Sequence, residues 1–325
     1  MTNQNTKNFI REPNSIKDGI PIFSLDDQYV ENYKNIAHDH IEAMRRTGNN
    51  PFIQEKLWIE LENSTKFLVN KYIPDGAKVL DAGVGLGRIL ANETRLQRYG
   101  IDISHEYLQE AKKKGFNVAF SRIEDMPFPD DYFDAVVACD VLEHVIDLHA
   151  CCLQLIRVLK PGGVLILRVP NLDDMSAYLD ESLPYKLVHL RSFDLSSLKI
   201  LFGKIYGMQF KEHSYTGHYL KDSLLKVKFL SKKSNIDNLE NKILPSNNFL
   251  RILIFLDYKN MIGRFFPKVK EAKQDADLLK KVLKISHEDF RRWIFRLRDS
   301  DPKLLEELLP EFVEPLEVNV VFDKQ

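Results

Sequence analysis

The sequence predicts an α/β fold, in which a doubly wound and mostly parallel sheet carries helices on both faces. Two observations support this prediction. Short apolar strands alternate with helical segments over residues 78–169, as the strands and crossover helices of a parallel sheet do. The stretch KVLDAGVGLGR, residues 78–88, joins a buried strand to three glycines at alternate positions, which is typical of the nucleotide-binding turn of such a sheet.

Residues 1–74 precede the first of these strands and predict a helical cap or lid on the sheet. Proline and glycine interrupt any period in residues 1–24, which we expect to be irregular. Asp26 or Asp27 is placed to cap a first helix, and residues 51–71 predict a second.

Tyr29 and Tyr33 lie one turn apart on the first expected helix. Two interpretations of this helix face stay open. The tyrosines either pack in the core, or they form a flap that closes over a ligand.

Residues 75–218 predict the core of the fold. The strand expected at residues 133–139 is nearly continuous in apolar residues, as a central parallel strand should be. Ser104 is placed to cap one helix, and the glycines that follow Pro161 stop another. Seven strands are expected in all, at residues 78–82, 99–104, 118–120, 133–139, 164–169, 208–215 and 316–322, with helices over 88–97, 104–111, 141–159 and 192–203.

Residues 219–325 break this regular alternation. Residues 224–309 are rich in lysine and mainly helical in pattern, and strand character returns only at about 316–322. We expect this last strand to rejoin the sheet, which makes the preceding helical segment an insertion. Within it, residues 249–266 alternate apolar and basic side chains. They predict either packing on their own domain or an interfacial helix that contacts a membrane or a lipid-linked substrate.

Acidic residues stand at the ends of successive strands, at Asp81, at Asp102 and at the pair Glu124 and Asp125. Asp102 lies 19 positions beyond Gly83, about where a doubly wound fold places an acid on ribose hydroxyls. The glycine turn is one residue tighter than the dinucleotide pattern G-x-G-x-x-G, and a ring of acids would repel a pyrophosphate. A ligand with an ammonium, a sulfonium, a ribose and an adenine suits these acids better.

At these residues the chain resembles the class I, Rossmann-like, S-adenosylmethionine-dependent methyltransferases that methylate small molecules. The stretches that carry the resemblance are VLDAGVGLGR (79–88), YGIDIS (99–104), IEDMPFPDDYFDAVVACDVLEHV (123–145), LKPGGVLILRVPN (159–171) and HLRSFDLSSLKILFGKIYGMQF (189–210). The flanks outside these stretches vaguely resemble accessory parts of methyltransferases found with sugar or surface-glycan biosynthesis.

The resemblance implies S-adenosylmethionine as the cofactor and assigns residues to bind it. Gly83 and Gly85 would back its methionine part, Asp81 would fix the turn or the amino group, and Asp102 would accept both ribose hydroxyls. Asp125 and the Met126 backbone would bind the adenine, and Cys139 and Asp140 would line the sulfonium side. The full expected set is Tyr33, Asp81, Ala82, Gly83, Gly85, Gly87, Asp102, Ile103, Glu124, Asp125, Met126, Cys139 and Asp140. Asp81 as a turn stabiliser and Glu124 as a surface acid stay open.

Methyl transfer needs a base only when the acceptor must lose a proton, as a hydroxyl must. His144 and His189 follow the fourth and fifth strands, where both can reach the carboxyl edge of the sheet. Each also has a structural interpretation, His144 as a helix-start residue bonded to the backbone and His189 as a support for the loop over residues 170–190. We expect no metal, since the three cysteines have no zinc-ligand spacing.

Composition narrows the compartment and the partners. The chain has 325 residues, a formal charge of −1 and a pI near 6.8, which argues against a surface that binds nucleic acid over the whole protein and leaves a local basic patch open. The polar N-terminus lacks the layout of a signal peptide, and no apolar run is long enough to span a membrane. With the cysteines expected to be reduced, these features predict a cytoplasmic protein.

We therefore expect an enzyme that methylates a small molecule, most simply a hydroxyl of a sugar, a lipid-linked intermediate or a secondary metabolite. A methyltransferase of RNA or protein is one alternative, although no Asn-Pro-Pro-Tyr-type tetrapeptide follows the fourth strand. A cofactor-binding protein without catalysis is another. A nicotinamide dehydrogenase is disfavoured, because the glycine spacing differs.

Overall fold

The computed structural model describes residues 8–53, 55–179, 184–220 and 313–325. The chain divides into two compact units, one of residues 1–217 with 315–325 and one of residues 218–314. The first unit holds the sheet. The second lies almost wholly outside the described residues, and so do the helical insertion and the interfacial stretch at 249–266 that the sequence predicts.

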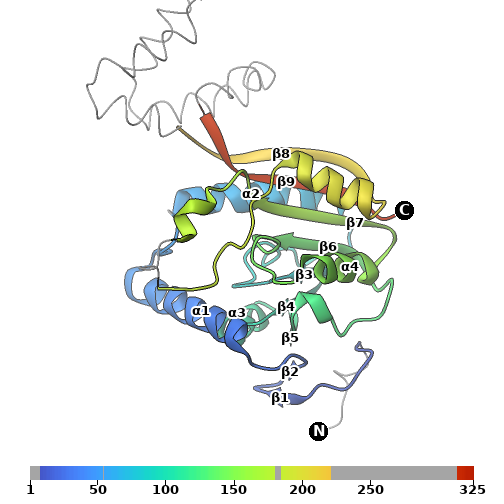
Figure 1. The fold of residues 1–325 in the computed structure, drawn as a ribbon. Coiled ribbons are helices and arrows are strands. Elements are labelled where there is room, and N and C mark those ends of the chain that lie inside the picture. The colour runs from blue at the N-terminus through green and yellow to red at the C-terminus, as the bar shows by residue number, and fades with distance from the viewer. Residues whose placement is uncertain (1–7, 54, 180–183, 221–312) are drawn as a thin grey trace, which may run out of the picture. The chain divides into compact units, whose positions relative to one another are not determined.

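Nine strands of the described residues form one sheet, with β1 and β8 at its edges (Figure 1). Neighbouring strands run parallel from β2 to β7, whereas β9 is antiparallel to β7. Their order is β1 (Ser15–Lys17), β2 (Ile20–Ile22), β5 (Asn117–Phe120), β4 (Gln97–Asp102), β3 (Lys78–Ala82), β6 (Phe133–Cys139), β7 (Leu159–Pro170), β9 (Val313–Asp323) and β8 (Gln209–Leu220).

This topology confirms the predicted α/β sheet and the return of the C-terminal strand to it. The chain runs outward from β3 through β4 to β5, then comes back to place β6 on the other side of β3. The connections after β3 and after β6 therefore leave the sheet in opposite directions. In open α/β sheets, ligands bind in the crevice that opens at such a point, at the carboxyl ends of the strands.

Two apolar clusters cover the two faces of the sheet. On β3 the side chain of Val79 enters one cluster and that of Leu80 the other, as the two-residue repeat of a strand requires. One face is covered by α1 (Gln28–Thr47), α2 (Glu55–Tyr72) and α3 (His105–Lys113), and the other by α4 (Leu148–Val158), α5 (Leu195–Leu198) and the π-helical turn that continues α5 over Lys199–Ile205. Two short 3₁₀ turns, Ile123–Asp125 and Met175–Leu179, complete the described elements.

The predicted caps hold two of these helices in place. The Asp27 side chain accepts a hydrogen bond from the Val30 amide at the start of α1, at 2.9 Å. The Ser104 hydroxyl accepts one from Tyr107 at the start of α3, at 3.4 Å. Both bonds satisfy amides that the first turn of a helix leaves without an intrahelical partner.

The prediction that residues 1–24 are irregular was wrong in part, because β1 and β2 form a hairpin there. Asp18 and Gly19 make its two-residue turn, both with positive φ, which is the geometry that Asp-Gly favours. Ile20 is fully buried, and β2 pairs with the edge of β5. An Asp-Gly signal outweighs the flanking prolines here.

The helix predicted over residues 88–97 was also wrong, because turns connect β3 to β4. Arg98 donates to the carbonyl oxygens of Leu90 and Ala91, at 3.2 and 2.6 Å. Arg95 donates to carbonyls at the end of α2. These arginine side chains bond to backbone carbonyls on both sides of the connection, and they hold the chain between β3 and β4 in turns and not in a helix. The helix predicted from residue 141 likewise begins only at Leu148, after a series of turns.

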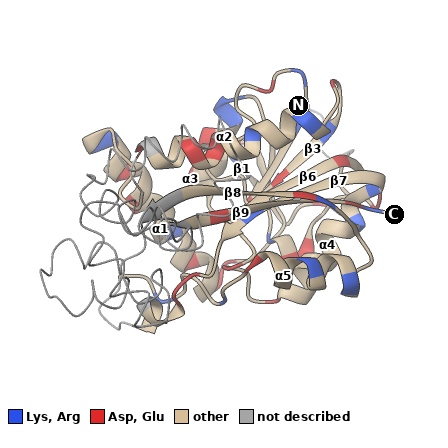
Figure 2. Ribbon diagram, turned by 90° about the horizontal axis from the view of Figure 1, so that it is seen from above, with Lys and Arg blue, Asp and Glu red and all other residues tan. Residues whose placement is uncertain are grey.

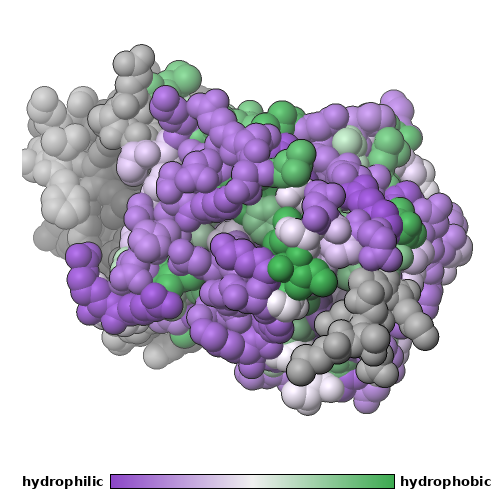
Figure 3. Space-filling model, turned by 90° about the horizontal axis from the view of Figure 1, so that it is seen from below, coloured by the Kyte–Doolittle hydropathy of each residue, from purple (hydrophilic) through white to green (hydrophobic). Residues whose placement is uncertain are grey.

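Charges of both signs are interspersed on the helices seen in Figure 2, whereas the strands between them are mostly uncharged. The face in Figure 3 shows apolar residues as separate areas among hydrophilic ones. No helix of the described residues is long and apolar enough to cross a bilayer.

Candidate active site

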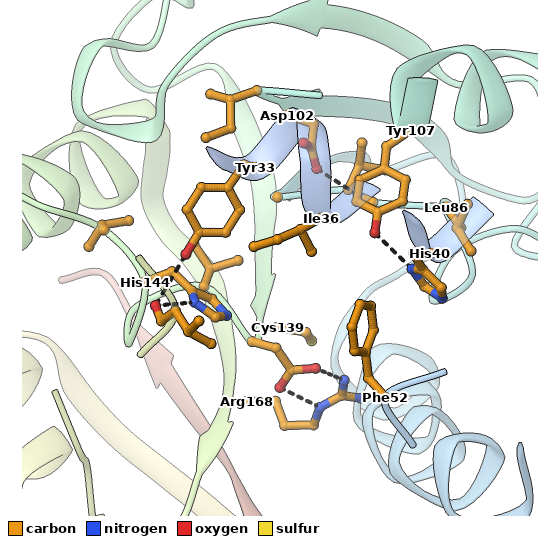
Figure 4. Close-up of a pocket in the computed structure, with 18 of the residues that line it drawn as sticks. Tyr33, Ile36, His40, Phe52, Leu86, Asp102, Tyr107, Cys139, His144 and Arg168 are labelled. Atoms are coloured by element: carbon orange, nitrogen blue, oxygen red, sulfur yellow. Dashed lines mark hydrogen bonds and ion pairs between the residues drawn. The ribbon is translucent and has the colours of Figure 1, made fainter. Parts of the chain in front are cut away.

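A cavity of about 720 Å³ opens at the carboxyl ends of the central strands (Figure 4). Figure 4 shows Asp102 and Tyr107 at one end of it and Arg168 at the other, with Tyr33 and His144 along one side. Eleven of the expected cofactor-binding and catalytic residues line this cavity, namely Tyr33, Asp81, Gly83, Gly85, Asp102, Ile103, Glu124, Cys139, Asp140, His144 and His189.

The three glycines of the turn after β3 have different structural tasks. All three have positive φ, which only glycine adopts without strain. A Cβ on Gly83 would lie 2.4 Å from Val141, and one on Gly87 would lie 3.2 Å from Ala111, so both glycines permit close packing. A Cβ on Gly85 would meet nothing within 4 Å. The open side of Gly85 is thus the part of the turn where a ligand can approach the backbone.

The Asp102 carboxylate is held by the backbone on either side of it. The Gly85 amide donates to one oxygen at 2.9 Å, and the Ser104 amide donates to the other at 2.8 Å. Burial raises the pKa of Asp102 to about 6, and these amide hydrogen bonds act in the opposite direction. Each oxygen keeps lone pairs that can accept further hydrogen bonds from a ligand in the cavity.

Asp81 is a buried carboxyl whose Oδ2 atom has no hydrogen-bond partner. Burial, and then the nearby charge of Asp102, raise the pKa of Asp81 to about 8. A buried polar atom without a partner is costly. Asp81 is therefore a candidate acceptor for a cationic group of a ligand.

The segment after β5 faces the cavity with other residues than the sequence predicts. Ile123 and Glu124 line the cavity, but the Asp125 side chain points to Arg11 and forms an ion pair of 2.6 Å with it. Met126 is buried in the core, 1% exposed. The short 3₁₀ turn sends consecutive side chains to different sides.

Asp125 and Met126 are therefore not brought to the cavity, and Ala82 and Gly87 do not line it either. The Ala82 side chain is fully buried in one of the two core clusters. The sequence offered no signal for the Arg11 contact, since Arg11 lies outside every motif.

Helix α1 forms one side of the cavity and is hydrogen-bonded to residues 186–188. The Tyr33 hydroxyl donates to the carbonyl of Val188 at 3.2 Å. The Asn32 side chain donates to the carbonyl of Leu187 at 2.7 Å and accepts from the amides of Lys186 and Leu187. Tyr29 is 6% exposed in the core yet also lines the cavity, so the two interpretations of this helix face are not exclusive.

A buried ionic group at the end of β7 was not predicted. Arg168 is 2% exposed and forms ion pairs with Asp140 and with Glu317 on β9, the latter at 2.6 Å. It also donates to the Thr65 hydroxyl of α2 at 3.2 Å. The only sequence signal is an arginine inside an otherwise apolar strand. The group ties β7, β9 and α2 together at the cavity.

His144 and His189 face each other, with ring centroids 4.7 Å apart. His144 shares a hydrogen bond of 2.8 Å between its Nδ1 atom and the Val188 carbonyl, while Nδ1 of His189 contacts Asp173 and the Tyr178 hydroxyl. Burial, followed by the charge of His189, lowers the pKa of His144 to about 4. The predicted backbone bond of His144 is present, but the helix begins four residues later.

Comparison with known protein families and sequences gives this geometry a context. The family described as methyltransferase domain matches residues 80–167. An uncharacterized protein of Methanocaldococcus jannaschii is 29% identical over 154 residues, which are 47% of this chain and 74% of that protein.

Two relatives carry named activities. A tRNA (carboxymethyluridine(34)-5-O)-methyltransferase of Arabidopsis thaliana is 31% identical over 100 residues, 30% of this chain and 25% of that protein. A ubiquinone/menaquinone biosynthesis C-methyltransferase of Vibrio campbellii is 32% identical over 124 residues, 32% of this chain and 47% of that protein. The chain thus spans a quarter to about half the length of these two methyltransferases.

Among solved structures, a methyltransferase of Thermotoga maritima described as a possible histamine N-methyltransferase has a TM-score of 0.44 at 19% identity, and the match covers 59% of this chain and 85% of that one. The matched residues 80–167 contain the end of β3, the glycine turn, Asp102, the strands β4 to β6 and most of β7. The chain therefore contains a methyltransferase domain over residues 80–167, and in this part it is similar to class I, Rossmann-like, S-adenosylmethionine-dependent methyltransferases.

Proposed function

We propose that this chain transfers a methyl group from S-adenosylmethionine to a hydroxyl oxygen of a small molecule, such as a sugar, a lipid-linked intermediate or a secondary metabolite. The observation that carries this proposal is that one cavity is lined both by the acids suited to the cofactor and by two histidines, each held by a hydrogen bond from its Nδ1 atom. The cofactor supplies a methyl group already activated on a sulfonium sulfur. The protein's task is to align the donor and the acceptor, which is worth up to roughly 7–11 kcal/mol.

Three features of the chain fit the cofactor's polar groups. Asp102 can also accept from two ribose hydroxyls, because a carboxylate has about four lone-pair sites and backbone amides, among them those of Gly85 and Ser104, do not use all of them. Asp81 offers a buried Oδ2 atom to the ammonium group. The backbone at Gly85 is open to the methionine part, and Gly83 allows the turn to pack against Val141.

The remaining walls fit the base and the reacting end. Ile123 and Glu124 supply an apolar and an acceptor contact for the adenine, in place of Asp125. Cys139 and Asp140 lie at the end of β6 and would line the sulfonium side, and Tyr33 covers it from α1.

Activation of a hydroxyl falls to the two histidines. A hydroxyl is a poor nucleophile unless its proton is removed or its pKa is lowered. His144 and His189 have their Nδ1 atoms engaged by Val188 and Asp173, which leaves Nε2 of each ring as the atom with a free lone pair when both rings are neutral. The structural support behind each ring fixes its orientation toward a substrate.

A small acceptor is favoured over RNA, although one relative is named as a tRNA methyltransferase. Helix α1 is bonded across the cavity to residues 186–188, which narrows the entrance. The formal charge is −1, and charges of both signs are interspersed on the helices of the described residues in Figure 2, an arrangement that does not favour binding of a phosphate backbone there. We infer a cytoplasmic location, in keeping with three free cysteines.

Calorimetry with S-adenosylmethionine, followed by transfer of a labelled methyl group into fractionated small-molecule extracts, tests this proposal. We expect each chain to bind one cofactor, and we expect the label to appear in a product that is a methyl ether. Label in RNA or protein fractions would instead support the alternative acceptor classes. Uptake without turnover in any fraction would leave a cofactor-binding protein without catalysis.

A further inference from the structure

Three side chains that could act as metal ligands lie close together, two from the turn after β6 and one from the segment that follows Leu187. Glu143, His144 and His189 each present a ligand atom, and these atoms all lie within 4.8 Å of one another. Nε2 of His144 is 3.8 Å from Oε1 of Glu143. Ligands on one ion at about 2.1 Å are separated by roughly 3–4 Å, so small side-chain movements would bring all three onto a single cation.

Glu143 gives an independent indication that a cation belongs here. Its side chain is buried, with the residue 1% exposed, and neither of its carboxyl oxygens has a hydrogen-bond partner. Burying a carboxyl without a partner destabilises the folded protein. Such a group is retained where a ligand completes its coordination, and two neighbouring imidazoles cannot donate to it when their Nε2 atoms carry lone pairs.

Both histidines are supported in the way that metal-binding histidines are. The Nδ1 atom of His144 lies 2.8 Å from the Val188 carbonyl, and that of His189 contacts the Asp173 carboxylate. A carbonyl or carboxylate behind one ring nitrogen keeps the proton there and directs the lone pair of the other nitrogen outward. These contacts therefore fix Nε2 as the ligand atom of each ring.

The backbone holds the two halves of the cluster together. The Leu190 amide donates to the carbonyl of Glu143 at 2.8 Å, and the Arg191 guanidinium donates to the carbonyl of Leu142 at 2.9 Å. The two segments are 45 residues apart in sequence yet bonded on both sides of the histidines. The site is thus formed before any ion binds.

We propose that Glu143, His144 and His189 bind one divalent transition-metal cation at the acceptor end of the cavity. Two imidazole nitrogens and one carboxylate suit Zn²⁺, Mn²⁺, Fe²⁺ and Co²⁺, and three protein ligands leave coordination positions open to a substrate oxygen. This proposal replaces the expectation of no metal, which rested on cysteine spacing alone.

The consequence for catalysis rests on the proposed function, whereas the metal site itself does not. A divalent cation lowers the pKa of an oxygen bound to it. An acceptor hydroxyl at an open position would release its proton to solvent, and its oxygen would then form the C–O bond as the C–S bond of the donor breaks, with the electron pair left on sulfur. The histidines would then hold the cation and would not themselves accept the proton.

Cobalt titration of the full chain tests the site without cofactor or acceptor. The protein, free of any affinity tag and stripped with a chelator, is titrated with Co²⁺ at neutral pH while the visible d–d absorption is recorded. We expect one Co²⁺ per chain in the wild type and in His149→Asn, a control whose ring contacts Tyr206 outside the cluster. Glu143→Gln and His189→Asn should lose the band, and Asp173→Asn should weaken binding by about 10–100-fold.

Circular dichroism melting of each variant separates loss of the site from loss of the fold, and Glu143→Gln keeps the shape of the side chain. Equal Co²⁺ binding by wild type, Glu143→Gln and His189→Asn would mean an adventitious ion only and would overturn the proposal. Absence of a d–d band from the folded wild type would overturn it too. Because no S-adenosylmethionine is present, either result leaves the proposed methyl transfer to be judged by its own assay.

Discussion

At the scale of single residues, the two neighbouring acids of the cavity differ in how they are satisfied. Asp102 already accepts hydrogen bonds from the Gly85 and Ser104 amides, whereas Oδ2 of the buried Asp81 accepts none. The hydrogen bonds of Asp102 therefore hold the glycine turn in its shape without a ligand. The missing partner of Asp81 is the one that we propose the cofactor's ammonium group supplies.

Replacement of Asp102 by Ala should weaken binding of S-adenosylmethionine by at least about tenfold. The variant loses hydrogen bonds between a charged acceptor and the ribose, each worth about 1.5–3 kcal/mol, and it frees the Gly85 amide. Isothermal titration calorimetry measures the change. Asp125→Ala is the matched control, because its side chain is 62% exposed and paired with Arg11, so its affinity should stay within about twofold of wild type. The reverse ranking would show that the adenine or ribose is held elsewhere.

The free energy of unfolding of the cofactor-free protein should fall as the pH rises from about 5 to about 8. The folded protein raises the pKa of Asp81 from 3.8 to about 8, so it binds more protons than the unfolded chain in this window and loses stability as they leave. Asp102, with a pKa raised to about 6, adds to this slope at the acid end of the window. Buried His144 and His40, with pKa values lowered from 6.5 to about 4, oppose it below about pH 6.5, so the fall in stability should be steepest above that pH.

Urea denaturation at several pH values measures this slope, and Asp81→Asn isolates the share of Asp81. The variant should be the more stable protein near pH 8, by a few kcal/mol to an order of magnitude, and nearly equal at the acid end of the window. A wild-type stability that increases steadily from pH 5 to pH 8 is incompatible with a protonated, partnerless Asp81.

At the scale of elements, the glycine turn and α1 form two walls of the cavity. In the turn, the amides of Gly83 and Val84 both donate to the Ile101 carbonyl, at 2.9 Å. Helix α1 is held by Asn32, whose amide group makes three hydrogen bonds to residues 186–187. Both walls are therefore held by hydrogen bonds, the turn to β4 and α1 to residues 186–187.

Gly87→Ala should destabilise the protein more than Gly48→Ala, although both positions have positive φ. The strain of a left-handed alanine costs about 1–2 kcal/mol at either site. At Gly48, the end of α1, an added Cβ meets nothing within 4 Å, whereas at Gly87 it lies 3.2 Å from Ala111 and from Phe116. Overpacking adds about 1–3 kcal/mol. Chemical denaturation of both variants gives the difference, and equal losses would mean that α3 moves away freely.

At the scale of the whole molecule, the residues whose positions can be predicted from the sequence are those fixed by their neighbours in the chain. Asp102 follows a buried strand and precedes a capped helix, so its place could be predicted from neighbours in sequence. Asp125 could not be placed, because its direction depends on Arg11, more than a hundred residues away. The Arg168–Glu317 pair depends on the register of β7 against β9. Contacts between residues far apart in the sequence decide where these side chains point, and no local pattern of a single sequence reveals such contacts.

The strand β9 should be indispensable to the fold, because it is an interior strand of the sheet. β9 lies between β7 and β8, and Val318, Val320 and Phe322 are fully buried. Each such side chain is worth about 1.5–3 kcal/mol. Loss of Glu317 would also leave Arg168 with one ion pair fewer, and breaking a buried pair costs about 3–5 kcal/mol. The sum matches the whole stability of a typical domain, about 5–15 kcal/mol.

A chain that ends at residue 312 should therefore fail to fold, whereas one in which a short Gly/Ser linker replaces residues 221–312 should fold and bind S-adenosylmethionine. The second variant keeps β9, and because β8 and β9 are neighbours in the sheet, a linker of loop length can join them. Circular dichroism and calorimetry compare both with the full chain. Cofactor uptake by the chain that lacks β9 would show that β1 to β7 are stable alone. Failure of the linker variant would assign to residues 221–312 a part in the stability of the sheet.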